Sequence, residues 1–385
     1  MAQELQLLIK PASADCNQSC AYCFYRGAHA AEPGARPRRM SGEVLDALIR
    51  RYLGLRLTQS VFCWQGGEPT LMGLGFFERA VELMQRHGSD GQSVGNALQT
   101  NGLLLDRDWC AFLRQYRFLL GLSLDGPAEL HDAYRRISPT KGSHEEALRA
   151  LRLLQAEQVK FNVLAVVNDV TARHARRVYR YFRELGLTHM QFIPCVEADA
   201  RSGAPAPFSV APEAYGDFLC ELFDEWLPEA RDGVSIRLFD GLLRRELHGE
   251  SGLCGWDGAC GGCPVVEYDG DVYPCDFFVQ PEWRLGNIRT TPLEKLVEGG
   301  RARRFRAARH DAPAACSECR WQELCRGGCL KDRRRISGRF DAPTYFCRSY
   351  QRFLPHAEGA IRKLARELRA ADAAPLCSGP DDREP

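Results

Sequence analysis

The sequence has no apolar run long enough to cross a bilayer and no secretory signal at its start. A membrane-spanning helix needs about 20 consecutive apolar residues, and no segment approaches that length. The first residues, Met-Ala-Gln-Glu-Leu-Gln, lack the basic start and apolar stretch of a signal peptide. We therefore expect a cytoplasmic protein with no membrane partner.

An excess of charge of either sign is also missing. The 51 Lys and Arg residues almost balance the 50 Asp and Glu residues, which leaves a net charge of +1. Binding to nucleic acid depends on a strongly positive surface. The balance therefore argues against nucleic acid as a partner.

The composition shows no sign of disorder, and no internal repeat of fixed period is present. Hydrophobic residues at 45% and charged residues at 26% are typical of a soluble globular protein. A chain of 385 residues exceeds the size at which single cores commonly stop growing, which predicts more than one domain. We expect domains at 1–235 and 236–350, followed by a C-terminal helix and tail at 351–385.

Cysteine is the residue type that stands out. The chain has 17 cysteines, of which three lie within Cys16 to Cys23 and nine within Cys254 to Cys347. A reducing cytosol disfavours disulfides, so clustered cysteines there indicate metal binding or catalysis. Cys63, Cys110, Cys195 and Cys220 have apolar surroundings and are expected to be small buried side chains, whereas Cys377 is expected to be a disordered thiol.

From residue 4 to about 230, short apolar runs alternate with segments of helical period, which is typical of repeated βα units around a parallel sheet. The predicted strands are Leu5 to Lys10, Ser60 to Trp64, Asn96 to Thr100, Phe118 to Leu124, Phe161 to Val167 and Met190 to Pro194. The predicted helices between them are 41–55, 74–87, 107–116, 143–157 and 171–185, with Ser41, Asp106 and Thr171 as N-caps. These units predict an α/β fold, a partial (β/α)6 TIM-like barrel.

In such barrels the functional loops follow the C-terminal ends of the strands. Four segments with Cys, Gly or polar residues follow predicted strands: 16–23 follows the first strand, 66–69 the second, 101–102 the third and 125–127 the fourth. We therefore expect the reactive site at that end of the barrel.

The second half of the chain changes character. Residues 198–212 indicate a linker or surface loop, and a helix over 213–227 is expected to close the first domain. From about residue 237 to 350 the chain is rich in Cys and Gly, and we expect few regular elements apart from a hairpin through Val265 to Tyr273. A helix over 355–371 precedes the tail. This predicts a C-terminal module organised by metal.

Cys16, Cys20 and Cys23 place three thiolates on one tight loop. A four-iron cluster held by three protein ligands keeps one iron open to bind a reactant. A structural zinc loop is the alternative, but zinc requires four ligands and the next cysteine, Cys63, lies in a predicted core strand. Tyr22 and its aromatic neighbours are compatible either with shielding a cluster or with a core.

The spacing Cys-x3-Cys-x-Tyr-Cys-Phe-Tyr resembles the signature of radical S-adenosylmethionine enzymes. The resemblance implies that the open iron binds S-adenosylmethionine, whose reductive cleavage gives a deoxyadenosyl radical that removes hydrogen from substrate. Gly66-Gly67-Glu68-Pro69 matches the family's glycine-rich turn. The resemblance places these residues around S-adenosylmethionine: Tyr22, Gly67, Ser123, Arg135 and Val196.

The second group of cysteines resembles the SPASM-type extension, in which eight thiolates hold two further four-iron clusters. The resemblance assigns one cluster to Cys254, Cys260, Cys275 and Cys329, and the other to Cys316, Cys319, Cys325 and Cys347. Cys263 has ligand-like spacing from Cys260 and is interpreted as a bystander. Two zinc sites are the alternative, because Cys-x2-Cys pairs are common in zinc ribbons.

Across nearly the whole chain the motifs resemble anaerobic sulfatase-maturating enzymes, including Gln-Gly-Gly-Glu-Pro-Thr at 65–70 and Val-Tyr-Pro-Cys-Asp-Phe-Phe at 272–278. The resemblance implies oxidation of a Cys or Ser of a sulfatase polypeptide to C-formylglycine, using three [4Fe-4S] clusters and S-adenosylmethionine. It also implies flavodoxin or ferredoxin as electron donor.

Asp276 follows a predicted cluster ligand, and the resemblance makes it the general base. Without the resemblance, a surface Asp in a turn is the better interpretation. A related maturase that makes thioethers, crosslinks or epimers in another peptide is the alternative enzyme, since scaffold does not decide function. A zinc-stabilised interaction module or an electron carrier is the alternative outside enzymology.

Overall fold

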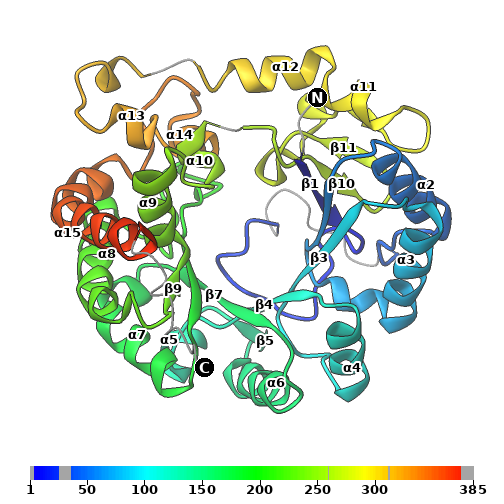
Figure 1. Ribbon diagram of the computed structural model, residues 1–385, viewed down its shortest axis with the longest axis horizontal. Coiled ribbons are helices and arrows are strands. Elements are labelled where there is room, and N and C mark those ends of the chain that lie inside the picture. Colours follow the sequence, from blue (N-terminus) through cyan, green and yellow to red (C-terminus); the bar gives the residue numbers. More distant parts are fainter. Residues whose placement is uncertain (1–3, 26–35, 259, 311–312, 374–385) are drawn as a thin grey trace, which may run out of the picture.

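A curved sheet of ten strands forms the centre of the protein (Figure 1). The computed structural model describes residues 4–25, 36–258, 260–310 and 313–373. The strand order is β12-β11-β10-β1-β2-β3-β4-β7-β8-β9, and the strands from β10 through β9 are parallel neighbours. Helices cover the outer face of the sheet, and the C-terminal segment with α12, α13 and α14 runs from one side of the open barrel to the other (Figure 1).

The strands are β1 Glu4–Lys10, β2 Gln59–Trp64, β3 Ser93–Thr100, β4 Leu119–Ser123, β7 Phe161–Val167, β8 His189–Pro194, β9 Ser235–Ile236, β10 Val265–Glu267, β11 Asp271–Tyr273 and β12 Gly286–Asn287. A separate pair consists of β5 Arg136–Ser138 and β6 Lys141–Gly142.

The helices of the barrel are α2 Gly42–Leu53, α3 Leu74–His87, α4 Arg107–Gln115, α5 Ala128–His131, α6 His144–Ala156, α7 Ala175–Glu184 and α8 Pro212–Trp226. The later helices are α9 Arg237–His248, α10 Cys254–Asp257, α11 Leu293–Val297, α12 Gly300–Ala307, α13 Gln322–Cys325, α14 Leu330–Ser337 and α15 Cys347–Ala373. Short 3₁₀ turns cover Pro69–Met72, Thr171–Arg173, Leu227–Glu229, Asp276–Phe278, Pro281–Trp283 and Ala314–Cys316.

The predicted partial (β/α)6 barrel is confirmed, and β1, β2, β3, β4, β7 and β8 are its six predicted strands. Inner and outer faces alternate along each strand, which gives β2 two fully buried aromatic side chains, Phe62 and Trp64, on the helix side. The predicted hairpin is β10 and β11, but it also extends the barrel sheet. β10 pairs in parallel with β1, so that Lys10 lies opposite Glu267.

Two of the three predicted N-caps are confirmed. The Ser41 hydroxyl accepts a hydrogen bond from the Val44 amide, and Asp106 accepts one from the Trp109 amide. The prediction for Thr171 was wrong because Asn168 performs the capping: its Oδ1 accepts the amides of Val170 and Thr171, each at 2.9 Å. Thr171 therefore lies inside a 3₁₀ turn, and α7 begins only at Ala175.

The C-terminal half is more helical than predicted. The 12-residue α9 lies where few regular elements were expected, and α15 begins at Cys347 rather than at residue 355. A proline inside a helix removes one hydrogen bond, which made Pro355 a poor candidate for a helix interior. Packing offsets that loss: the Phe353 ring lies 5.5 Å from Phe239 and 5.9 Å from Phe223.

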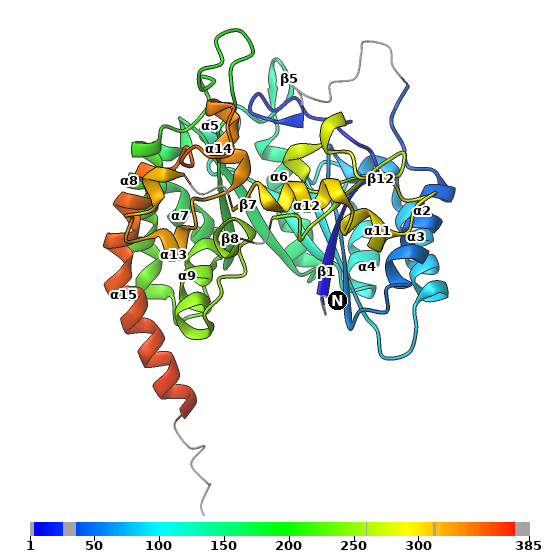
Figure 2. The same ribbon diagram turned by 90° about the horizontal axis from the view of Figure 1, so that it is seen from above.

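α15 is anchored to α8 along one side and then extends away from the barrel (Figure 2). Arg348 pairs with Glu213 at 2.9 Å, and Ser349 donates to the Pro212 carbonyl at 2.5 Å. No described helix is both long and apolar enough to cross a membrane. The predictions for Cys377 and the tail after residue 373 concern residues outside the described part of the chain.

Candidate iron-sulfur and active site

The loop with Cys16, Cys20 and Cys23 follows β1 and is held against the segment after α5. The amides of Ser19 and Ala21 donate to the carbonyls of Arg136 and Tyr134, at 2.7 and 3.0 Å. Desolvation, the Glu68 carboxylate and the Cys20 and Cys23 thiolates raise the pKa of Cys16 to about 12. The structure thus brings the three thiols close enough to interact, with Asn101 donating to Cys16 Sγ at 3.7 Å.

The Gly66-Gly67-Glu68-Pro69 turn packs directly under this loop. The Gly67 amide donates to the Ser13 carbonyl at 2.6 Å, and a Cβ at Gly67 would lie 2.0 Å from the Asp15 carbonyl oxygen. Any side chain at Gly67 would therefore push away the segment that leads to Cys16. Gly67 supports the cysteine loop through backbone approach.

Glu68 links the ends of two strands. It is fully buried, and its Oε1 accepts hydrogen bonds from the hydroxyls of Thr70 and Thr100, at 2.6 and 2.8 Å. Its Oε2 accepts the Asn101 amide at 2.8 Å. Burial raises the pKa of Glu68, while these hydrogen bonds lower it. The carboxylate is committed to structure, so it is not available as a base.

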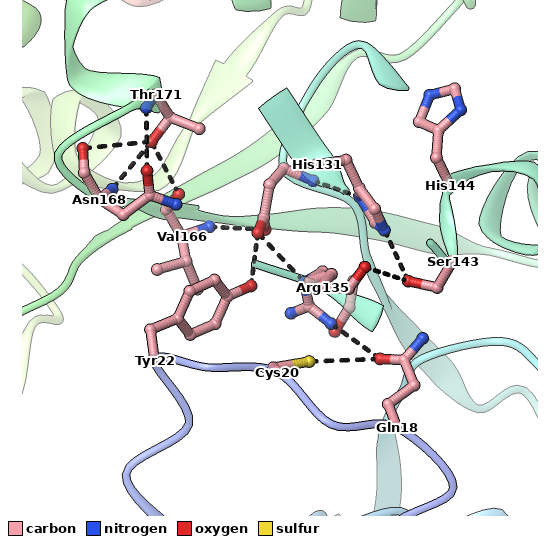
Figure 3. Close-up of polar contacts among 12 residues, drawn as sticks. Gln18, Cys20, Tyr22, His131, Arg135, Ser143, His144, Val166, Asn168 and Thr171 are labelled. Atoms are coloured by element: carbon pink, nitrogen blue, oxygen red, sulfur yellow. Dashed lines mark hydrogen bonds and ion pairs between the residues drawn. The ribbon is translucent and has the colours of Figure 1, made fainter. Parts of the chain in front are cut away.

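Asp125 is buried and is the common partner in a second network, whose members Tyr22, Arg135 and Val166 are labelled in Figure 3. Its Oδ2 accepts hydrogen bonds from the Tyr22 hydroxyl and from Arg135 Nε, the latter at 3.2 Å, and its Oδ1 accepts the Val166 amide at 2.9 Å. Sequence reasoning did not identify Asp125 as the group that holds Tyr22 and Arg135. Its position after β4, in Asp-Gly-Pro, was the available signal.

Gln18 connects this network to the cysteine loop. Its Oε1 accepts from Cys20 Sγ and from Arg135 Nη1, each at 3.5 Å (Figure 3). Partial burial raises the pKa of Cys20, the Arg135 guanidinium lowers it, and the Cys23 thiolate raises it. Arg135 is therefore a buried cation beside the predicted cluster loop.

Ser123 and Val196 are the other predicted contacts of S-adenosylmethionine. Both are buried at C-terminal strand ends, Ser123 at the end of β4 and Val196 just after β8. Gln99 donates to the Ser123 hydroxyl at 3.0 Å, and the Val196 carbonyl accepts Lys331 Nζ at 2.8 Å. All five predicted contacts thus lie at one end of the barrel, although only Tyr22 and Arg135 share a partner in the described structure.

Asp276 joins the two halves of the chain. Its Oδ2 accepts hydrogen bonds from the Tyr25 hydroxyl at 2.5 Å and from Gln65 Nε2 at 3.2 Å. Tyr25 follows the cysteine loop and Gln65 follows β2, so Asp276 lies beside the predicted S-adenosylmethionine site. It is not a surface residue in a turn, since its side chain is only 11% exposed.

A fully buried lysine lies beneath Asp276. Lys10 Nζ is 2.7 Å from Glu267 Oε1 and 3.5 Å from Asp276 Oδ1, and it lies 4.2 Å from the centre of the Tyr25 ring. Burial raises the pKa of Asp276, and the Lys10 ammonium opposes that shift. Sequence reasoning missed both Lys10 and Glu267, because parallel pairing of β1 with β10 brings them together.

Four cysteines of the C-terminal module influence one another's pKa values in pairs and therefore lie near one another: Cys254, Cys260, Cys275 and Cys329. Burial raises the pKa of Cys329 to about 12, and the thiolates of Cys254 and Cys260 add to the shift. For Cys275, burial and then the Cys329 thiolate raise the pKa. The structure thus brings Cys329 beside the earlier cysteines despite its distance in sequence.

The other four cysteines form a second group at the start of α15. Cys316, Cys319, Cys325 and Cys347 together line one small cavity. Burial and then the thiolates of Cys347 and Cys316 raise the pKa of Cys325 to about 11.

Cys263 lies outside both groups but close to the first. Burial raises its pKa to about 12, and the nearest thiolates that contribute are those of Cys63 and Cys254. Of the cysteines expected to be small buried side chains, Cys110 and Cys195 are buried, whereas Cys63 and Cys220 are only half-buried.

The donor sets fit iron-sulfur clusters. Thiolates are the ligands that hold such clusters, and a set of three suits a cluster with one open iron, whereas sets of four suit closed ones. Thiols release their protons to solvent when they bind metal as thiolates, and a site of this kind does not exist in the unfolded chain, so metal binding and folding are coupled.

Loss of one thiol from the second group tests this coupling. Cys347→Ala or Cys316→Ala is expected to give cluster-poor or insoluble protein, because the segments that carry Cys316, Cys319 and Cys325 have little core of their own. Iron content and soluble yield measure the effect, with Cys220→Ala as the matched control. Full iron in a soluble Cys347→Ala protein would contradict the grouping.

Comparison with known proteins identifies two domain families. The model of the Radical SAM superfamily matches residues 11–182, and that of the SPASM iron-sulfur cluster-binding domain matches residues 256–320. The cysteine-type anaerobic sulfatase-maturating enzyme of Clostridium perfringens is 39% identical over 367 residues, covering 95% of this chain and 99% of that protein. The serine-type enzyme of Bacteroides thetaiotaomicron is 34% identical over 384 residues, covering 95% and 92%.

Solved structures of sulfatase-maturating enzymes are also similar to this chain. Native anSMEcpe with bound AdoMet and Cp18Cys peptide has a TM-score of 0.88 at 39% identity, covering 95% of this chain and 99% of that one. SuiB of Streptococcus suis, with bound S-adenosylmethionine, has a TM-score of 0.57 at 15% identity, covering 85% and 73%, and shares the fold alone. With its cysteine loop, its two further cysteine groups and these similarities, the chain belongs to the anaerobic sulfatase-maturating enzymes of the radical S-adenosylmethionine superfamily.

Proposed function

We propose that this protein oxidises a Cys or Ser side chain of a sulfatase polypeptide to C-formylglycine. The observation that carries the proposal is the position of Asp276. It is the one carboxylate of the described structure that links the cysteine loop, through Tyr25, to a cysteine of the C-terminal module, Cys275. A base at that junction can take a proton from a substrate held between the two halves.

The two oxygens of Asp276 have different surroundings. Oδ2 is engaged by Tyr25 and Gln65, which fixes the orientation of the carboxylate. Oδ1 is buried and lies 3.5 Å from Lys10 Nζ. We infer that this carboxylate accepts the thiol or hydroxyl proton of the substrate.

Lys10 and Glu267 hold the base in place. With Lys10, Glu267 and Asp276 all charged, the buried cluster has one more negative charge than positive. Such a site accepts a proton readily, since protonation of Asp276 neutralises the excess charge. Lys10 therefore balances Glu267, while Asp276 can change its protonation state.

The chain's own residues would hold three clusters and S-adenosylmethionine. We propose Cys16, Cys20 and Cys23 as ligands of the first cluster, and the two groups of four described above as ligands of the others. Tyr22, Gly67, Ser123, Arg135 and Val196 are proposed to surround S-adenosylmethionine, with Asp125 holding Tyr22 and Arg135. When bound, these groups supply hydrogen abstraction from the substrate Cβ and take up the remaining electron.

The division of the chain follows from these sites. We propose a barrel domain at 1–235, a cluster domain at 236–350 and a C-terminal helix and tail at 351–385. The oxidation removes one hydrogen atom, one proton and one electron from the substrate; from Cys this gives a thioaldehyde, which water hydrolyses to the aldehyde with release of hydrogen sulfide. Reductive cleavage of S-adenosylmethionine needs one electron from outside the protein, so flavodoxin or ferredoxin is the proposed electron donor. The proposed location is the cytoplasm.

Mass spectrometry of a sulfatase peptide tests the proposal. The protein, purified without oxygen and reduced with dithionite, is expected to convert a Cys-x-Pro-x-Arg peptide or its Ser version to an aldehyde, with deoxyadenosine formed alongside. The aldehyde is checked by hydrazide labelling, and a peptide with Ala at the target position is the control. A crosslinked, thioether-containing or epimerised product without aldehyde would contradict the proposal.

A further inference from the structure

Three exposed arginines lie close together on α12, and the proposed reaction uses none of them. They are Arg301, Arg303 and Arg304. Among the described residues no carboxylate lies within ion-pair distance of any of the three, and Arg301 and Arg303 donate to the backbone carbonyls of Arg284 and Glu298 instead. Because the net charge of the whole chain is only +1, these arginines are a local excess of positive charge.

The side of α12 that faces away from solvent packs on an aromatic cluster. Phe305 is 1% exposed, and its ring lies 5.0 Å from that of Phe278 and 5.2 Å from that of Trp283. Cys260 and Cys275, which belong to the first cysteine group, pack against the same cluster. One aromatic layer therefore connects α12 to two proposed cluster ligands, and α12 itself lies at the periphery of the molecule (Figures 1 and 2).

Arginine side chains also contact this aromatic layer from the surface. The guanidinium carbon of Arg304 lies 4.9 Å from the centre of the Trp283 ring. That of Arg334, on α14, lies 5.1 Å from the centre of the Phe340 ring, which is 5.9 Å from Trp283. Aromatic faces attract cations, so these contacts hold positive charge directly over the layer that packs on the cysteines.

The surface beside the second cysteine group does not have this excess. Arg320, which follows Cys319, pairs with Glu358 at 2.8 Å, and Arg362 pairs with the same side chain at 2.8 Å. The carboxylate of Glu323 is also exposed there. Positive and negative charges offset each other near the second group, so the charge of the module favours the first group as the place where an acidic protein approaches.

We propose that the exposed arginines of α12 form the docking surface for an acidic one-electron carrier protein, which takes the substrate's electron from the cluster of the first group. The inference rests on the proposed function, in which the substrate proton goes to Asp276. One electron passes from the reduced cluster to the oxidised carrier, and no bond forms or breaks in that step. Complementary charge speeds such encounters and orients the partner, and the planar guanidinium of arginine matches the geometry of carboxylates.

Affinity measured without oxygen tests the surface, with oxidised flavodoxin and oxidised ferredoxin as the probes. The protein is the full chain with its clusters. Replacement of Arg301, Arg303 and Arg304 together by Glu is expected to raise the dissociation constant about tenfold or more at low salt. The parental affinity should also fall as salt is added, because salt screens exposed charges. Replacement of the same residues by Lys keeps the charge and should leave the affinity near the parental value.

A matched control reverses three charges elsewhere on the protein. Arg79, Arg86 and Arg107 are exposed on α3 and α4, so their replacement by Glu changes the net charge by the same amount. That variant is expected to bind both probes like the parent.

A parental dissociation constant in the Glu variant of α12, with iron retained, would overturn the inference. An equal loss of affinity in the Lys variant or in the control would overturn it too, as would failure of both probes to bind the parent. If the Glu variant loses iron, replacement of the three arginines by Gln takes its place, and unchanged affinity there overturns the inference. A parent that binds a carrier but makes no aldehyde would instead contradict the proposed function.

Discussion

Replacement of Cys16, Cys20 and Cys23 by Ala is expected to abolish the cleavage of S-adenosylmethionine and to remove about a third of the iron. The three thiols lie on one loop whose amides are bound to the segment after α5. Their loss removes every proposed protein ligand of the cluster with the open iron, while the two C-terminal groups keep theirs. Deoxyadenosine measured by chromatography and iron measured colorimetrically report the two effects.

A matched control removes three thiols from elsewhere in the chain. Cys63, Cys110 and Cys220 belong to none of the three proposed ligand groups, so their replacement by Ala is expected to leave iron and cleavage near the parental values. Unchanged cleavage in the Cys16, Cys20 and Cys23 variant would show that the reaction starts elsewhere. Loss of all iron, rather than about a third, would show that the clusters do not form independently.

Asp276→Asn is expected to lower the yield of formylglycine by a factor of about 10² to 10⁴, the usual effect of losing a general base. Asn retains the shape of the side chain and can still accept hydrogen bonds from Tyr25 and Gln65, but it cannot take the substrate proton. The fold tolerates the change, because Lys10 keeps its 2.7 Å contact with Glu267. Iron should therefore be unchanged, and some deoxyadenosine should still form.

The measurement is the ratio of aldehyde to deoxyadenosine with one sulfatase peptide under dithionite. Asp271→Asn is the matched control: its side chain is 16% exposed, lies in the hairpin that precedes Asp276 and pairs with Arg284. That variant is expected to keep the parental ratio. A parental ratio in Asp276→Asn would remove Asp276 from the mechanism. Asp125 and Glu68 are poor substitutes, since their oxygens already hold Tyr22, Arg135, Thr70 and Thr100.

Local pattern was sufficient to predict the barrel strands. β7 has the predicted bounds, Phe161–Val167, and the other five differ by one to three residues at an end. Buried parallel strands are short apolar runs separated by amphipathic helices, and that pattern depends on neighbours along the chain. The errors occurred where distant residues decide: Asn168 caps the turn before α7, and packing of Phe353 on Phe239 allows Pro355 inside α15.

Local sequence pattern could not predict the residues that surround Asp276. Asp276 was identified by its neighbour Cys275 and by family resemblance, but its partners come from three places: Lys10 from β1, Tyr25 after the cysteine loop and Gln65 after β2. In the sequence, a lysine at the end of a strand, such as Lys10, cannot be distinguished from a lysine exposed to solvent. Only the parallel pairing of β1 with β10 reveals that it lies beside two carboxylates, those of Glu267 and Asp276.

The amino-acid sequence by itself determined the chemistry available to this protein. A cluster with an open iron is indicated by the short spacing of Cys16, Cys20 and Cys23. Residues so close in sequence stay close in space whatever fold the rest of the chain adopts. The tertiary structure decided which side chains surround the cysteines and the other predicted site residues. It brought Cys329 to Cys254 and held Tyr22 and Arg135 on Asp125. These contacts join segments far apart in the chain, which only folding brings together, and their charges interact more strongly once burial has excluded the water between them.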